Sequence, residues 1–123
     1  MNEPVALIVE DDAKLADIFS AAVRAARFTT VVAENGRTAL TLLQNQTPAL
    51  IVLDLHLPDV PGTEVLNFIK QAAHLAQTVV MLATADAWLA ESLRPEVDFV
   101  LMKPISFAQL RDLTGRLRPS TPA

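Results

Sequence analysis

Residues 50–62 read LIVLDLHLPDVPG, and this stretch decides how the chain folds. Four apolar residues, two of them β-branched, lead directly into Asp54, which is the pattern of a short strand buried on both faces of a sheet. Pro58, Pro61 and Gly62 follow, so the chain must turn there. The stretch therefore predicts a carboxylate at the carboxyl end of a central strand, which is the edge where open α/β sheets bind ligands.

Four further runs of apolar or β-branched residues predict strands, at residues 5–9, 29–33, 78–83 and 99–102. After each strand, apolar residues recur three and four positions apart, which is the spacing of an amphipathic helix. These segments predict helices over about residues 13–26, 37–45, 63–73, 86–94 and 107–117. Short strands that alternate with amphipathic helices indicate a parallel sheet covered by helices on both faces.

Several helix starts carry a capping signal. Asp12, Asn35 and Ser106 each stand just before a predicted helix, and all three are residue types that favour the N-cap position. Thr63 or Gly62 is expected to cap the third helix.

Three large apolar side chains are assigned to the core because they fall on the apolar face of a predicted helix. They are Ile18 in the first helix, Trp88 in the fourth and Phe107 in the last. The alternative for Trp88 is an exposed anchor for a partner protein, and the alternative for the last helix is a dimer surface.

The composition limits the class of protein. Half of the 123 residues are apolar (51%), which is enough for one domain with its own core. A formal net charge of −4 argues against a nucleic-acid-binding surface. The chain has no cysteine, which removes disulfides, thiol catalysis and thiolate metal sites, and its three glycines form no glycine-rich phosphate loop.

No apolar run approaches the roughly 20 residues of a membrane span, and the first residues lack the basic segment of a secretory signal. We therefore expect a soluble cytoplasmic protein that binds neither membrane nor nucleic acid directly. Residues 1–118 are expected to form the domain, and residues 119–123, which include two prolines, a tail or the start of a linker.

Four of the predicted strands end in side chains that can carry chemistry, namely Glu10, Asp11, Asp12, Asp54, Thr84 and Lys103. Because the carboxyl ends of parallel strands lie at one edge of a sheet, we expect these side chains to converge. Carboxylates that converge repel one another unless a cation lies between them, and Mg²⁺ suits a few carboxylates with several waters. A lysine and a hydroxyl nearby would help to stabilise an anionic group transferred onto a carboxylate.

In this order, the segments LIVEDD, DLHLPDVPG, Thr84-Ala85 and Lys103-Pro104 resemble the receiver domain of two-component response regulators. The resemblance covers about residues 5–117. It implies a flavodoxin-like, doubly wound α/β fold whose five-stranded parallel sheet has the order 2-1-3-4-5, with helices on both faces.

The resemblance also implies roles for individual residues. Asp54 would accept a phosphoryl group from a phosphohistidine on a sensor histidine kinase or a phosphotransfer protein. Mg²⁺ would be bound by Asp11, Asp54, the backbone carbonyl of His56 and, through water, Glu10.

The remaining implied roles lie on the last two strands. Thr84 and Lys103 would contact the phosphoryl oxygens, and the bond before Pro104 would be cis.

The sequence departs from the family at the position three residues before the lysine. The family usually has an aromatic residue there, and this chain has Val100, while Phe99 falls on the opposite face of the strand. The span from Thr84 to Lys103 is also shorter than the family commonly has, which predicts that the fourth helix or its loops are trimmed.

Two positions near the site vary within the family and tune how long the phosphoryl group survives. In this chain they are His56 and Asp86, and we hypothesise that this pair sets the dephosphorylation rate. Asp86 could orient a water or pair with His56.

Three functions remain open from the sequence. The first is a phosphorylatable signalling switch, which is no enzyme beyond its own phosphorylation and dephosphorylation, and which would act on a downstream protein or form a homodimer. The second is a protein-interaction module that keeps the fold without the switch. The third is a Mg²⁺-dependent phosphohydrolase with Asp54 as its nucleophile.

Overall fold

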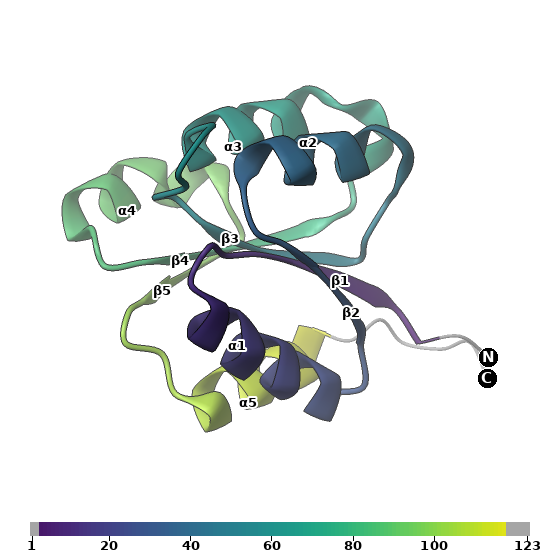
Figure 1. Ribbon diagram of the computed structural model, residues 1–123, viewed down its shortest axis with the longest axis vertical. Helices are drawn as coiled ribbons and strands as arrows, with labels where there is room; N and C mark the ends of the chain where they lie inside the picture. Colours follow the sequence, from purple (N-terminus) through teal and green to yellow (C-terminus); the bar gives the residue numbers. More distant parts are fainter. Residues whose placement is uncertain (1–2, 118–123) are drawn as a thin grey trace.

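A computed structural model describes residues 3–117 of the chain. In this part of the chain, strands and helices alternate as the sequence predicts (Figure 1). The strands are β1 (Val5–Val9), β2 (Thr29–Ala33), β3 (Leu50–Asp54), β4 (Val79–Thr84) and β5 (Phe99–Met102). The α-helices are α1 (Ala13–Ala25), α2 (Gly36–Asn45), α3 (Gly62–Gln71), α4 (Ala87–Leu93) and α5 (Phe107–Leu117), and two short 3-10 helices are η1 (Ala73–Leu75) and η2 (Arg94–Glu96).

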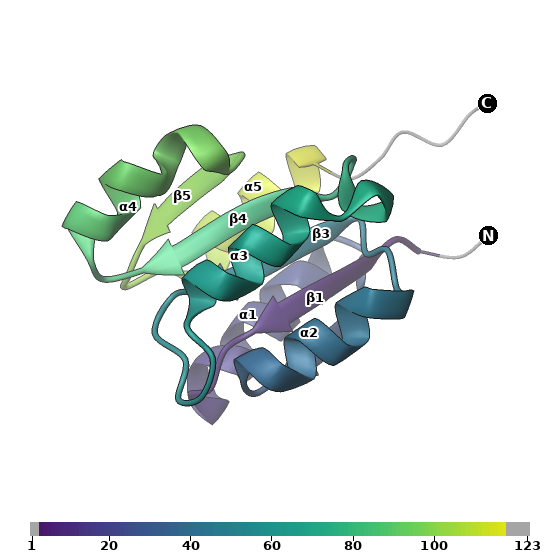
Figure 2. The same cartoon turned by 90° about the horizontal axis from the view of Figure 1, so that it is seen from above.

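The strands form one parallel sheet in the order β2-β1-β3-β4-β5. The arrowheads of β1, β4 and β5 point to the same side in Figure 2. Helices α1 and α5 cover one face, and α2, α3 and α4 cover the other (Figure 1). The doubly wound fold and its strand order are therefore confirmed.

Two apolar layers hold the helices to the sheet. One lies under α1 and α5, and its largest buried side chains include Phe19, Phe28 and Leu110. The other lies under α2, α3 and α4 and includes Leu43 and Leu66. Every residue of β3 is buried, because this strand has neighbours on both sides and helices over both faces.

Three of the predicted helix caps are present. The side chain of Asp12 accepts hydrogen bonds from the backbone N–H groups of the first turn of α1. Asn35 caps α2 through the N–H of Thr38, and Ser106 caps α5 through the N–H of Gln109. Each cap satisfies donors that the helix itself leaves unpaired.

The predicted cap of α3 is wrong. The helix begins at Gly62, its N-cap is Pro61, and no side chain caps it. The reason is the tight turn after β3, where the N–H of Gly62 donates to the carbonyl of Leu55 at 3.0 Å. A Cβ at Gly62 would lie 2.5 Å from the Cα of Leu55, so only glycine fits this approach.

The assignment of Trp88 to the core is also wrong, because its side chain is 86% exposed. Helix α4 has only seven residues, and it covers the sheet with Leu89 and Leu93, which lie one turn apart. Trp88 therefore lies on the outer side of the helix. Ile18 and Phe107 are also assigned to the core from the sequence. They are 42% and 40% exposed, so they lie at the margin of the core.

Smaller differences concern the ends of elements. Strand β4 is shifted by one residue from its predicted range, and α3 ends at Gln71.

None of the helices among residues 3–117 is long and apolar enough to cross a membrane. The predicted tail at residues 119–123 lies outside the described residues.

Candidate functional site

The sheet brings the predicted site residues to one edge. Asp54 is the last residue of β3 and Thr84 the last residue of β4. Glu10 directly follows β1, and Lys103 directly follows β5. Because all these strands run parallel, their carboxyl ends meet, and four distant parts of the sequence contribute to one site.

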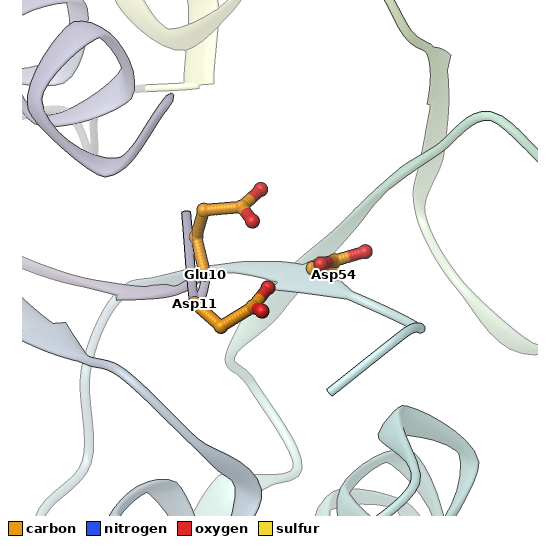
Figure 3. Close-up of side chains that lie close together, drawn as sticks. All are labelled: Glu10, Asp11 and Asp54. Carbon is orange, nitrogen blue, oxygen red and sulfur yellow. The ribbon is translucent and has the colours of Figure 1, made fainter. Parts of the chain in front are cut away.

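Three carboxylates form the centre of this site. Glu10, Asp11 and Asp54 each offer one oxygen atom, and these oxygens all lie within 4.8 Å of one another (Figure 3). Glu10 and Asp54 are buried, and Asp11 is exposed. An all-oxygen donor set of this size, open on one side to water, fits a hard divalent ion such as Mg²⁺.

Lys103 is the positive partner of the buried acids. Its Nζ donates a hydrogen bond to Oε1 of Glu10 at 2.8 Å and lies 3.6 Å from Oδ1 of Asp54. Its backbone N–H donates to the carbonyl of Thr84 at 2.8 Å, which holds the end of β5 beside β4. The bond between Lys103 and Pro104 is cis, as the resemblance implies.

The surroundings of Glu10 raise the pKa of its carboxyl group. Burial raises the pKa of this carboxyl, and the negative charge of Asp54 raises it further. The hydrogen bonds from Lys103 and from the backbone N–H of Asp12 oppose this, but the net pKa lies above its ordinary value. Three carboxylates face one lysine in this cluster, so a cation between them would relieve the repulsion among the acids.

Thr84 and Asp86 connect the site to α4. The hydroxyl oxygen of Thr84 accepts a hydrogen bond from the N–H of Asp86 at 3.0 Å, and Thr84 is fully buried. Asp86 caps α4 by accepting from the N–H of Leu89 at 3.0 Å. The hydroxyl is thereby held at the start of the helix that follows β4.

His56 borders the site on the other side. Its backbone N–H donates to Oδ1 of Asp54 at 3.2 Å. Its exposed imidazole lies 3.8 Å from Oδ2 of Asp86, measured from Nε2. The two side chains that the sequence suggests as a pair therefore lie near each other, on the loops that follow β3 and β4 beside Asp54.

Val100 and its neighbour Phe99 lie on opposite faces of β5. Val100 packs against the apolar layer under α4, whereas Phe99 packs against the layer under α5. Phe99 therefore does not substitute for an aromatic side chain at position 100, because neighbouring residues of a strand face opposite sides.

Sequence reasoning missed Asp59. Its carboxylate accepts hydrogen bonds from the first two N–H groups of α2, those of Gly36 at 2.9 Å and Arg37 at 3.1 Å. Desolvation acts to raise the pKa of Asp59, but several backbone N–H donors, including those of Val60 and Gly36, together lower it. Its partners lie more than 20 positions earlier in the chain, so no local pattern could reveal the contact.

Known proteins resemble this chain in sequence. The family model described as "Response regulator receiver domain" matches residues 6–114. The DNA-binding response regulator MtrA of Mycobacterium tuberculosis is 30% identical over 112 residues, which cover 91% of this chain and 48% of that protein. The chain thus spans about half the length of this relative.

Solved structures share the architecture. The receiver domain of the Francisella response regulator 1452 is 26% identical, with a TM-score of 0.80 and coverage of 93% of this chain and 95% of that one. The chemotaxis response regulator CheY4 of Vibrio cholerae has a TM-score of 0.85 over 94% of this chain and 99% of that one, and at 19% identity it supports the fold alone.

Proposed function

Because this chain belongs to the family of response regulator receiver domains, we propose that it is a phosphoacceptor switch of cytoplasmic two-component signalling. Asp54 takes a phosphoryl group from a phosphohistidine of a sensor histidine kinase or a phosphotransfer protein. The modified domain then changes its binding of a downstream protein or of a second copy. The observation that carries the proposal is the convergence of Glu10, Asp11, Asp54 and Lys103 at the carboxyl edge of the sheet.

Asp54 acts as the nucleophile. One of its carboxylate oxygens forms a bond to phosphorus while the bond from phosphorus to the histidine nitrogen breaks, and the imidazole leaves with the electron pair. The hydrogen bond from the N–H of His56 and the ammonium of Lys103 orient the carboxylate before the reaction. Because Asp54 is buried, these interactions are stronger than they would be in water.

Asp11, Asp54 and the backbone carbonyl of His56 would hold Mg²⁺ directly, and Glu10 would hold it through water. The all-oxygen cluster of three carboxylates beside one lysine supports this ligand set. When bound, the ion supplies positive charge that offsets the charge of the incoming phosphoryl group.

Thr84 and Lys103 would bind the phosphoryl oxygens. The ammonium of Lys103 already lies 3.6 Å from Asp54, so it is close to the position where new negative charge would appear. The buried hydroxyl of Thr84 ends the neighbouring strand and is linked to the start of α4. A hydrogen bond from this hydroxyl to a phosphoryl oxygen would therefore change the position of the residues that begin α4.

His56 and Asp86 would set the lifetime of the phosphoryl group, because they border Asp54 and Thr84 and pair with each other. Replacing either by alanine opens the approach of water. We expect His56→Ala and Asp86→Ala to change the first-order rate of phosphoryl loss, measured by intact-protein mass against time. An unchanged rate in both variants would remove this role.

A second candidate is an interaction module of the same fold that does not switch. Val100 and the seven-residue α4 favour it, because the segment that would report the modification is short and lacks the aromatic side chain usual in the family. Such a module would bind its partner equally well with and without phosphodonor.

Incubation with Mg²⁺ and acetyl phosphate tests the proposal. The chain is expected to gain one phosphoryl group, detected by intact mass, and Asp54→Asn is expected to gain none. Asp112→Asn is the matched control, since Asp112 lies on the exposed surface of α5 and pairs with Arg111. No adduct on the wild-type chain contradicts the switch, and steady release of phosphate without an adduct indicates a phosphohydrolase.

A further inference from the structure

The loop between β3 and α3, residues 55–61, carries His56 next to the acidic cluster. It is fixed at both ends. The N–H of His56 donates to Asp54 at 3.2 Å, and the N–H of Gly62 donates back to the carbonyl of Leu55 at 3.0 Å. These bonds close the two ends of the loop but leave its middle to other contacts.

Asp59 fixes the middle of this loop to α2. Each of its two carboxylate oxygens accepts one backbone N–H, from Gly36 and from Arg37. A negative charge at a helix N-terminus is favourable, because the helix dipole and the unpaired N–H groups both point toward it. The lowered pKa of Asp59 agrees with a carboxylate that stays charged in this place.

The two segments are also packed tightly at this point. A Cβ at Gly36 would lie 2.6 Å from the carbonyl oxygen of Val60 and 2.7 Å from its Cβ. Val60 and Leu57, from the same loop, pack on the apolar layer under α2 and α3. The glycine therefore permits the close approach that lets the carboxylate of Asp59 reach the helix.

Helix α2 already has a cap of its own. The side chain of Asn35 accepts the N–H of Thr38 at 2.8 Å. What Asp59 adds is a connection between α2 and the β3–α3 loop, 22 to 23 positions away in sequence. The two caps therefore differ in one respect, because Asn35 stays within its own helix and Asp59 joins two elements.

We propose that Asp59 is a positioning residue of the phosphoacceptor site. By holding the β3–α3 loop against α2, it fixes the backbone of His56, including the carbonyl that the proposed function assigns to Mg²⁺. The inference rests on that proposed function for the metal, but the connection itself can be tested without it.

The test compares Asp59→Ala with Asn35→Ala in the full chain. Both variants remove one cap from the same helix end, so both are expected to lower Tm by a similar amount. Only Asp59→Ala releases the loop. We expect it to weaken Mg²⁺ binding about tenfold by calorimetric titration, as found when partners that orient a metal ligand are removed. In the metal-free protein it should also speed amide exchange at residues 55–57 and 59–60, the loop positions that carry a backbone N–H.

Two further variants sharpen the result. Asp59→Asn keeps one acceptor oxygen and is expected to lie between the wild type and Asp59→Ala in both measurements. Gly36→Ala keeps the carboxylate but drives its Cβ against Val60, and it should also speed exchange in the loop. Asp59→Asn further serves as the milder variant if Asp59→Ala does not fold.

Three results would overturn the inference. They are unchanged loop exchange in the Asp59 variants, unchanged Mg²⁺ affinity in them while the wild type binds the ion, and equal weakening of Mg²⁺ binding by Asn35→Ala. A wild-type chain that binds no Mg²⁺ is a different result. It contradicts the proposed metal site and, with it, the role of Asp59 in positioning a metal ligand. Faster amide exchange of the β3–α3 loop in Asp59→Ala would still establish the connection of this loop to α2.

Discussion

The carboxyl edge of the sheet and the α4–β5 end of the molecule differ in how they are built. At the edge, Glu10, Asp54 and Lys103 lie at the ends of three strands and are joined by contacts of 2.8 and 3.6 Å. At the α4–β5 end, the helix is seven residues long, Trp88 is 86% exposed, and Val100 occupies the position of the usual aromatic.

This difference separates the residues proposed to react with the phosphoryl group from the residues that would report the modification to a partner. The residues proposed to react with the phosphoryl group are held by the strands, which cannot move without breaking the core. The residues that would report the modification lie on a short helix whose outer face has few contacts. We therefore expect substitutions at the edge to have large effects on stability and substitutions at the outer face of α4 to have small ones.

The largest effect is expected at Lys103. Lys103→Met leaves the buried carboxylates of Glu10 and Asp54 without their positive partner, which should lower the free energy of unfolding by about 3 kcal/mol in the absence of Mg²⁺. Urea denaturation with a chelator present measures this loss, and added Mg²⁺ should recover part of it. Lys70→Met is the matched control, since Lys70 is exposed and donates to the backbone carbonyl of Glu96. Equal stability of the two variants would show that the buried acids do not depend on Lys103.

The next effect concerns the turn that follows β3. Gly62→Ala places a methyl group 2.5 Å from the Cα of Leu55, and the resulting strain should cost about 2 kcal/mol. Gly115→Ala is the control, because a Cβ there meets nothing within 4 Å and alanine favours the helix by about 0.5–1 kcal/mol. The two variants should therefore shift Tm in opposite directions, and a shift in the same direction would refute the close approach.

A smaller effect, with a defined pH dependence, is expected for Glu10. Since the pKa of Glu10 is raised above the ordinary value of 4.5, the folded chain binds its proton more tightly than the unfolded chain. Wild-type stability without metal should fall as pH rises from about 4.5 through the raised pKa. Glu10→Gln lacks this loss, so its stability relative to the wild type should increase over the same interval and then level off. Chelator-treated samples unfolded in urea at several pH values provide the measurement, and parallel pH curves for the two proteins would contradict it.

The smallest effect is expected at Trp88. Trp88→Ala removes a large side chain that is almost entirely exposed, so the free energy of unfolding should change by less than about 0.5 kcal/mol. Leu89→Ala, one position along the same helix, should cost more because Leu89 packs on the core. A large loss in Trp88→Ala would place this side chain in the core after all and would remove the contrast between the two regions.

Much of the fold could be predicted from the order of its segments. Buried runs such as residues 50–53 and amphipathic stretches between them permit little besides a parallel sheet with helices on both faces. The convergence of Asp54 and Lys103 followed from the same reasoning, because parallel strands end at one edge. The helix caps at Asp12 and Asn35 were also predictable, since their partners lie two or three residues away.

Other features were not predictable because they depend on how distant elements pack. Trp88 and Leu89 are consecutive apolar residues of α4. Only the rotation of the helix on the sheet decides which of them is buried. Nothing near Asp59 in the sequence identifies its partners on α2.

The sequence by itself determined the alternation of strands and helices and the residues at the strand ends, because these depend on local periodicity and on the single edge that parallel strands share. Only the tertiary structure decided the raised pKa of Glu10, the exposure of Trp88 and the connection of Asp59 to α2. These properties arise from burial and from contacts between segments far apart in the chain, and neither is encoded in any local pattern.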